Sequence, residues 1–135
     1  MSKRDEASLL QWISTIKRDH TIFIPTIHEE CGLQTIGTPL DLYEYTKVDG
    51  FKPDYIHLYM VISKMYNEKY GCSVGKLDEI ADKSGKSLRS IQRDIIVLEK
   101  VGLIHYTKSV DNKNYYICIT PKSADQVRTM KDILI

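Results

Sequence analysis

The spacing of apolar residues changes abruptly at Gly102, and this change constrains the fold more than any other feature of the chain. Between Pro53 and Gly102, apolar residues recur every three or four positions, the period of a helix packed on a core. In residues 103–108 and 115–120 they alternate with other residues, which predicts a pair of strands. We therefore expect several helices followed directly by a β-hairpin with a polar tip.

Three helices are predicted before this change. The first opens at Pro53, because proline is tolerated in the first turn of a helix, and is expected to stop at residues 70–71. A short second helix is predicted over residues 74–83, and residues 84–86 form the turn that ends it. The third helix begins at Ser87, whose hydroxyl can cap it, and closes just before the hairpin.

The segments outside this centre are predicted separately. Residues 5–19 form an amphipathic helix, and residues 21–24 form a brief strand. Residues 26–52 lack clear periodicity and are expected to be mostly loop, with one possible short element at residues 40–45. A last amphipathic helix runs from Pro121 to the C-terminus.

The length and composition favour one folded unit. A chain of 135 residues with 42% hydrophobic residues can bury one core. We expect an N-terminal extension over residues 1–52, a central domain over 53–120 and a C-terminal helix over 121–135. No apolar run is long enough to span a bilayer, and the first residues lack the apolar segment of a signal peptide, so we expect a cytoplasmic protein without a membrane partner.

The net charge of +1 hides an uneven distribution. Residues 86–114 contain six basic and three acidic residues, whereas residues 1–52 contain six basic and eight acidic ones. Any electrostatic attraction to nucleic acid is therefore expected in the second half of the chain.

The order of helix, short helix, turn, helix and hairpin is that of a winged helix-turn-helix. Residues 77–81, 84–87, 91–93 and 98–104 resemble the core of bacterial winged-helix regulators and of the N-terminal domains of plasmid and phage replication initiators. The resemblance covers residues 53–120. It implies an α+β, mostly helical fold that binds double-stranded DNA, as a transcriptional regulator or as a phage or plasmid replication or partition accessory factor.

The third helix would then be the recognition helix that enters the major groove. Arginine binds guanine bidentately and glutamine binds adenine in the same way, so this helix has the chemistry for direct reading of bases. The side chains expected to face outward are Ser87, Arg89, Ser90, Gln92 and Arg93.

A second group of polar residues is expected to contact the DNA backbone or the minor groove. Near the turn, Lys83 and Lys86 can neutralise phosphates. At the hairpin tip, amide donors and cations suit a phosphate or the adjacent minor groove. These tip residues are Lys108, Asn112, Lys113 and Asn114.

A homodimer is expected, with the apolar stripes of the first and last helices as candidate contact surfaces. Two recognition helices about one DNA turn apart predict an inverted repeat with half-sites roughly 10 base pairs apart.

Other interpretations remain open. The basic helix face is also typical of an ordinary solvated surface, on which Arg93 pairs with Glu99 or Asp94. The whole fold can instead serve as an interaction module for a replication or transcription protein, without touching DNA. A small-molecule sensor with a pocket walled by residues 26–52 is a third alternative, for which no convergent polar groups identify a ligand.

No enzyme activity, metal site or cofactor is predicted. The run His28-Glu29-Glu30-Cys31 contains metal-binding groups without the spacing that places two ligands on one helical face. The three cysteines are far apart and odd in number, so we expect buried, reduced thiols at all three positions.

Overall fold

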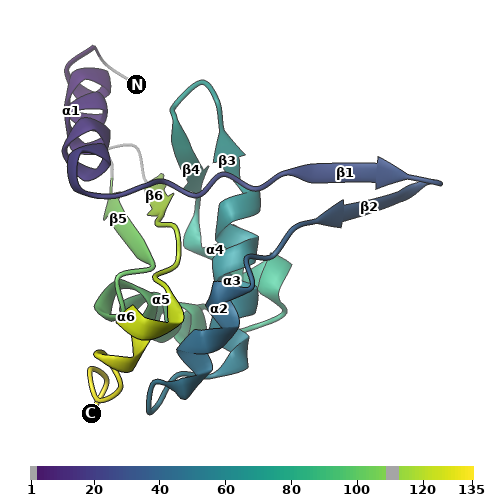
Figure 1. Cartoon of the computed structure of the whole chain (residues 1–135). Coiled ribbons are helices and arrows are strands. Elements are labelled where there is room, and N and C mark those ends of the chain that lie inside the picture. The colour runs from purple at the N-terminus through teal and green to yellow at the C-terminus, as the bar shows by residue number, and fades with distance from the viewer. Residues whose placement is uncertain (1–2, 109–112) are drawn as a thin grey trace.

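The computed structural model describes residues 3–108 and 113–135, apart from the side chain of Lys108. Within these residues the protein is α+β, with six α-helices and two antiparallel sheets (Figure 1). The predicted α+β class is therefore confirmed. In chain order the elements are α1 (Lys3–Asp19), β1 (Ile27–Glu30), β2 (Leu33–Ile36), α2 (Asp41–Glu44), the 3-10 helix η1 (Tyr45–Lys47), α3 (Pro53–Lys64), β3 (Tyr66–Asn67), β4 (Cys72–Gly75), α4 (Leu77–Ser84), α5 (Leu88–Lys100), β5 (Ile104–Lys108), β6 (Asn114–Cys118) and α6 (Ala124–Arg128).

The larger sheet has the strand order β3–β4–β6–β5, with every neighbouring pair antiparallel. Strands β5 and β6 form the hairpin predicted after Gly102, in a register that pairs Ile104 with Cys118. Strand β4 adds to the other edge of β6, where Ser73 pairs with Tyr116. The hairpin is confirmed, and residues 109–112 of its expected tip lie outside the described residues.

The strands β3 and β4 form a short hairpin where the first central helix was predicted to continue. Helix α3 ends at Lys64 and does not reach residues 70–71. The carbonyl of Asn67 accepts the amides of both Tyr70 and Gly71, and Gly71 adopts a positive φ of 75°, so the chain reverses here. The prediction of a helix to residues 70–71 was wrong. Tyr66 continues the apolar spacing of α3, but it belongs to strand β3 and pairs with Ser73.

Helices α3, α4 and α5 pack around a common core on one face of the sheet. Tyr59, Ile80, Ile91 and Leu98 are fully buried there. Helix α4 begins three residues later than predicted, because Val74 belongs to the sheet. The turn after α4 is confirmed.

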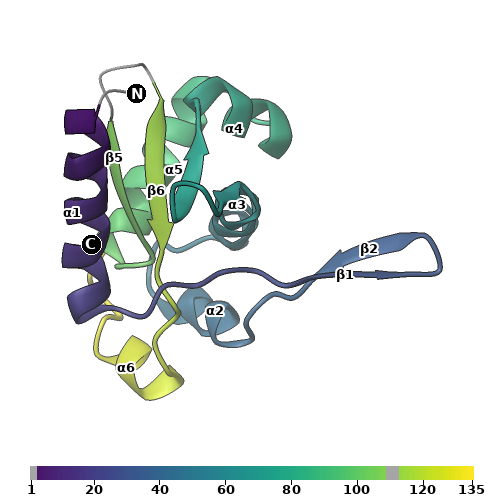
Figure 2. The ribbon, with the colours of Figure 1, turned by 90° about the horizontal axis from the view of Figure 1, so that it is seen from above.

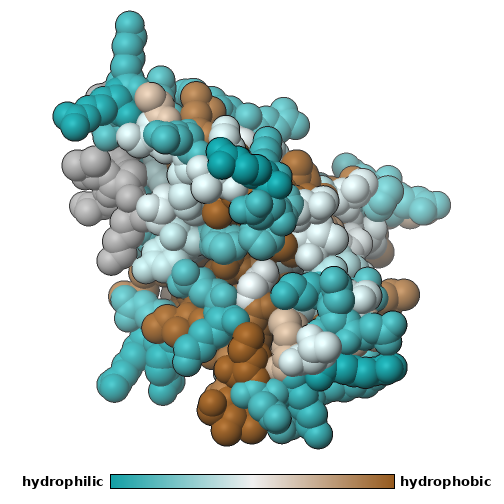
Figure 3. Space-filling model, turned by 60° about the vertical axis from the view of Figure 1, so that its left-hand side comes forward, coloured by the Kyte–Doolittle hydropathy of each residue, from teal (hydrophilic) through white to brown (hydrophobic). Residues whose placement is uncertain are grey.

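Helix α1 covers the opposite face of the sheet (Figure 2). Its buried residues Leu9 and Ile13 pack in a cluster with Tyr115 and Ile117 of β6. All five residues of β6 are therefore buried, since the strand is covered on both faces. The predicted N-terminal helix is confirmed, and its apolar stripe packs on its own chain. Figure 3 shows this side of the molecule as mostly hydrophilic, with hydrophobic residues gathered toward its lower end.

Residues 20–52 contain more regular structure than predicted. The expected strand at 21–24 is a single bridge between Ile22 and Ile119. The prediction of mostly loop was wrong for β1 and β2, which form a separate hairpin that extends away from the body (Figure 1). Its turn holds Cys31 and Gly32 at positive φ, and Cys31 is exposed, contrary to expectation. The short element at 40–45 is confirmed by α2 and by the burial of Leu42 and Tyr45.

The C-terminal helix is shorter than predicted. Helix α6 begins at the Ser123 cap and ends at Arg128, after which the chain continues in turns. Val127 and Met130 are buried in the same core as α3 and α5. This stripe also packs on its own chain, so neither predicted dimer surface is free in the way we expected.

Candidate nucleic-acid interface

Helix α5 has one face fixed in the core and one face open to solvent. Ile91, Ile95 and Leu98 are buried and hold the helix against its neighbours. On the other side, the side chains of Arg89, Gln92 and Arg93 are exposed, as predicted. Within the part of the chain that the structure describes, neither arginine forms an ion pair. The two guanidinium groups are therefore available to a ligand.

The first turn of α5 is built by two serines. The Ser87 hydroxyl oxygen accepts the backbone amide of Ser90 at 3.2 Å, and the same hydroxyl donates to the Ser90 hydroxyl at 3.0 Å. Such a cap satisfies an amide that has no partner within the helix. Both serines were predicted to read bases, whereas here their hydroxyls are engaged in starting the helix.

Lys86 lies in the turn between α4 and α5 and is held by two carboxylates. Its Nζ atom is 3.1 Å from Oδ2 of Asp54 and 3.1 Å from Oδ2 of Asp94. Burial lowers the pKa of Lys86, but its hydrogen bonds to the two carboxylates outweigh this and raise the pKa. The predicted phosphate contact of Lys86 is thus not supported, because its charge is already compensated inside the protein.

The same ion pairs test the alternative in which the outer face of α5 is an ordinary solvated surface. We considered that Arg93 pairs with Asp94 or Glu99 on an ordinary surface. Asp94 pairs with Lys86 instead, and Arg93 forms no ion pair among the described residues. That pairing was therefore wrong.

Lys83 lies at the end of α4, beside α3. It lines an open pocket of about 420 Å³ together with two further polar side chains, His57 and Lys64, and three apolar ones. We call this surface the α3–α4 groove; its residues are Ile36, His57, Met60, Val61, Lys64 and Lys83. The structure thus places Lys83 near Lys64, a cation that was not predicted as part of a site, and the groove includes no residue of α5.

The hairpin tip agrees only in part with the prediction. Lys113 is exposed and precedes β6. Asn114 is only 7% exposed, because it is the first residue of β6 and pairs with both Gly75 and Lys108. The burial of Asn114 leaves little of its side chain for the predicted contact with DNA. Asn112 lies outside the described residues, and Lys108 is the last residue of β5.

Two exposed apolar residues of α5, Leu88 and Ile96, were missed, and Ile96 lies beside the predicted site. Ile96 is 54% exposed on the same side as Gln92 and Arg93, and it borders a shallow pocket of about 220 Å³. Leu77 and Tyr106 also line this pocket. The signal was present in the sequence, since Ile95 and Ile96 are adjacent and cannot both face the core.

Comparisons of the chain with protein-family models, with curated proteins and with solved structures found no match. Over the described ranges, no group of three or more His, Cys, Asp or Glu side chains is arranged to hold a metal ion. In the same residues, no helix combines the length and the apolar character needed to cross a membrane. The candidate interface therefore rests on the geometry of α5 and its neighbours.

Proposed function

We propose that this protein is a winged helix-turn-helix protein that binds double-stranded DNA, with α5 as its recognition helix. In this proposal α4, the turn at Gly85 and α5 form the helix-turn-helix, and β5–β6 forms the wing. The antiparallel order β4–β6–β5 beside α3, α4 and α5 supports this assignment. The observation that carries the proposal is the exposed face of α5, on which both arginines lack an ion pair among the described residues.

The chemistry of this face suits the major groove. Arg89 and Arg93 can each donate two hydrogen bonds to a guanine, and Gln92 can do so with an adenine. Ile96 adds an apolar group of the kind that contacts a thymine methyl. Lys113 supplies a cation beside the wing for the backbone.

Lys86 has a different role in this proposal. Its ion pairs with Asp54 and Asp94 join the turn to α3 and α5. Lys86 is therefore a positioning residue, which sets the angle at which α5 is presented and does not itself contact DNA.

The proposed DNA binding also suggests the biological role of the protein. A small domain that reads a DNA sequence serves as a transcriptional regulator or as a replication or partition accessory factor of a phage or plasmid. As a cytoplasmic homodimer it would bind an inverted repeat with half-sites roughly 10 base pairs apart. A footprint without two-fold symmetry would contradict this geometry.

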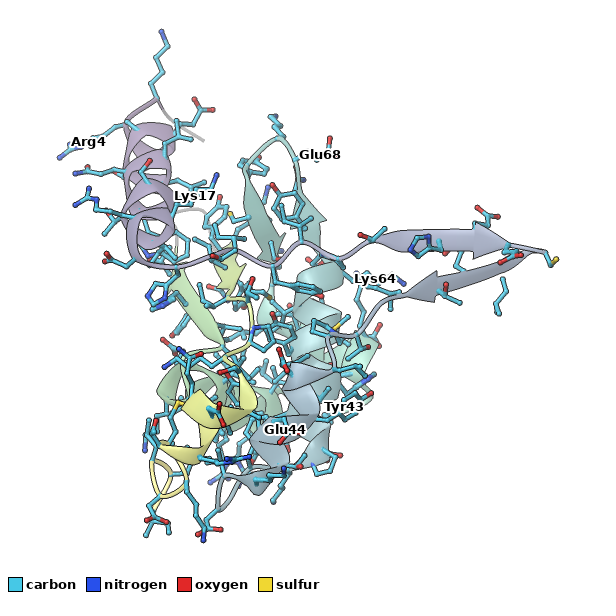
Figure 4. The ribbon with its side chains drawn as sticks, in the orientation of Figure 1. Arg4, Lys17, Tyr43, Glu44, Lys64 and Glu68 are labelled. Atoms are coloured by element: carbon cyan, nitrogen blue, oxygen red, sulfur yellow. The ribbon has the colours of Figure 1, made fainter. Side chains whose placement is uncertain are left out.

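Fluorescence anisotropy with mixed genomic duplex fragments, measured across a salt series, tests the proposal. We expect binding that weakens with salt, because cations that contact phosphates release counterions. Arg89→Ala/Arg93→Ala should weaken binding by about tenfold or more, since each lost bidentate contact costs about 1–3 kcal/mol. The matched control is Arg4→Ala/Arg18→Ala, which removes the same charge from α1, where Arg4 points away from the body (Figure 4). Absence of wild-type binding at low salt would exclude DNA as the ligand.

A second candidate function, docking on another protein, is favoured by one observation. The exposed Ile96 and the adjoining pocket form an apolar surface next to Gln92 of the candidate interface. Leu77, which lines this pocket, begins α4. The same helix carries three exposed acidic residues, Asp78, Glu79 and Asp82. Co-purification of a partner that is lost in Ile96→Asp, without any DNA affinity, would favour this function.

A further inference from the structure

The hairpin of β1 and β2, which we call the arm (residues 27–36), has few contacts with the rest of the protein. Its strands pair only with each other. Every residue of the arm is exposed except Ile36, which is half-buried at its root. A lone two-stranded hairpin is only marginally stable in water, so the arm lacks the support that a partner would provide.

The outer part of the arm combines apolar and acidic groups. Glu30 pairs with Leu33 in the register, and cross-strand partners in an antiparallel pair share one face of the hairpin. Glu29 lies next to them on the other face, opposite Gln34. Leu33 is 65% exposed, so its side chain is free to contact another surface.

The α3–α4 groove has the complementary character. Its apolar part is formed by Ile36, Met60 and Val61, and its polar part carries the cations Lys64 and Lys83 with His57. Figure 4 shows Lys64 in the angle between α3 and the root of the arm. An apolar surface bordered by two lysines fits a segment that presents a leucine and two glutamates.

The root of the arm borders the groove of its own chain, but the tip of the arm points away from it (Figures 1 and 2). Ile36 at the root of the arm already lines that groove, and the strands extend from there away from the body in both views (Figures 1 and 2). The tip, with Glu29, Glu30 and Leu33, therefore extends outward, beyond the groove of its own chain. A second copy of the chain, in contrast, offers an identical groove.

We propose that two copies of this protein exchange arms, so that the arm of each docks in the α3–α4 groove of the other. Such an exchange is two-fold symmetric and uses the same contact twice. Glu30 and Leu33, which share one face of the arm, lie against the groove of the second copy, with Glu30 toward Lys64 and Lys83 and Leu33 on the apolar part. Glu29, on the other face, adds negative charge to the same tip. The groove contains no residue of α5, so the exchange leaves the exposed face of α5 open and does not depend on DNA binding.

Charge reversal separates this arrangement from any other dimer. The arm variant Glu29→Lys/Glu30→Lys and the groove variant Lys64→Glu/Lys83→Glu change only exposed side chains. In either variant alone, both reciprocal contacts become repulsive. In a one-to-one mixture both contacts join opposite charges again, because the reversed arm meets the reversed groove and the natural arm meets the natural groove.

Analytical ultracentrifugation without DNA, at low ionic strength and over a wide concentration range, tests the proposal. We expect a concentration-dependent wild-type dimer, monomers for each variant alone and a restored dimer in the mixture. The wild-type dimer should weaken as salt is added. Glu6→Lys/Glu68→Lys, a reversal of two exposed carboxylates outside the arm, should dimerise like the wild type, and circular dichroism checks that all variants fold.

Three results would overturn the proposal: a wild-type monomer at all concentrations, a groove variant that dimerises like the wild type, or a mixture that remains monomeric. The second result would point to pairing of the two arms edge to edge through β2. Arg89→Ala/Arg93→Ala should dimerise normally, so failure of the proposed DNA binding and failure of arm exchange give different results.

Discussion

Lys86 and Asp94 form an ion pair, with 3.1 Å between Nζ and Oδ2, that fixes the turn between α4 and α5. The Asp94 side chain is 13% exposed and that of Lys86 28%, so this pair is better shielded than the pair of Lys86 with Asp54, whose side chain is 64% exposed. The geometry of the candidate interface is thus set by a charged contact beneath it.

Replacing Asp94 with Asn should destabilise the protein. The substitution leaves the half-buried ammonium of Lys86 with only the exposed Asp54, and loss of a hydrogen bond to a charged group costs about 1–3 kcal/mol. Urea unfolding measures the change. Asp125→Asn is the control, because its pair with Arg128 is exposed and such pairs contribute little. Equal stability of the two variants would show that the Lys86 pair does not fix the turn.

Tyr59→Phe should lower the free energy of unfolding by about 1–2 kcal/mol. The Tyr59 hydroxyl donates a buried hydrogen bond of 2.8 Å to the carbonyl of Ile119, and phenylalanine leaves that acceptor without its donor. Thermal or urea unfolding measures the loss. Tyr43→Phe on the exposed side of α2, where Figure 4 labels Tyr43, should be neutral.

Only Cys31 should react with an alkylating reagent in the folded protein. Cys31 is exposed at the turn of the arm, whereas Cys72 and Cys118 are buried. Burial raises the pKa of Cys72 to about 12 and also raises the pKa of Cys118, which keeps both as unreactive thiols. Mass spectrometry after brief alkylation should show one modification in buffer and three in denaturant; rapid native labelling at Cys72 or Cys118 would contradict their burial.

Stability should fall as the pH is lowered from about 7 to about 5, with a contribution from His105. Burial and the neighbouring ring of His20, 5.2 Å away between centroids, lower the pKa of His105. The unfolded chain therefore binds this proton at a higher pH than the folded protein does, and acid favours unfolding below the unfolded pKa of about 6.5.

The comparison of His105→Gln with the wild type isolates that contribution. Urea unfolding at both pH values should show a smaller loss of stability in the variant. His28→Gln, on the exposed arm, is the matched control and should retain the wild-type loss. An unchanged pH dependence in His105→Gln would remove His105 as a source.

The elements that could be predicted are those whose burial leaves a pattern in the sequence. Helices α1, α4 and α5 bury one side, which leaves a helical period, and the buried strand β6 leaves a β-rich apolar run. The arm leaves no such period, because nearly all of its side chains are exposed. Strand β3 was hidden because Tyr66 happens to continue the spacing of α3.

In the candidate site, only the positions that depend on local helical spacing could be predicted. The outward positions of Arg89, Gln92 and Arg93 follow from helical period alone. The partner of Lys86 on α3, in contrast, is Asp54, which lies 32 positions away and is brought close only by packing. The burial of Asn114 likewise depends on its pairing with Gly75, from a strand that was not predicted.

The packing of α1 on the far face of the sheet limits how early this helix can reach its native position during synthesis. Leu9 and Ile13 leave the ribosome early, but their partners Tyr115 and Ile117 follow about a hundred residues later. Helix α1 therefore cannot complete its packing until β6 has been made, and part of its apolar stripe stays exposed to solvent or to chaperones until then. Helix α1 is therefore made before β6 but can complete its packing only after β6 is made.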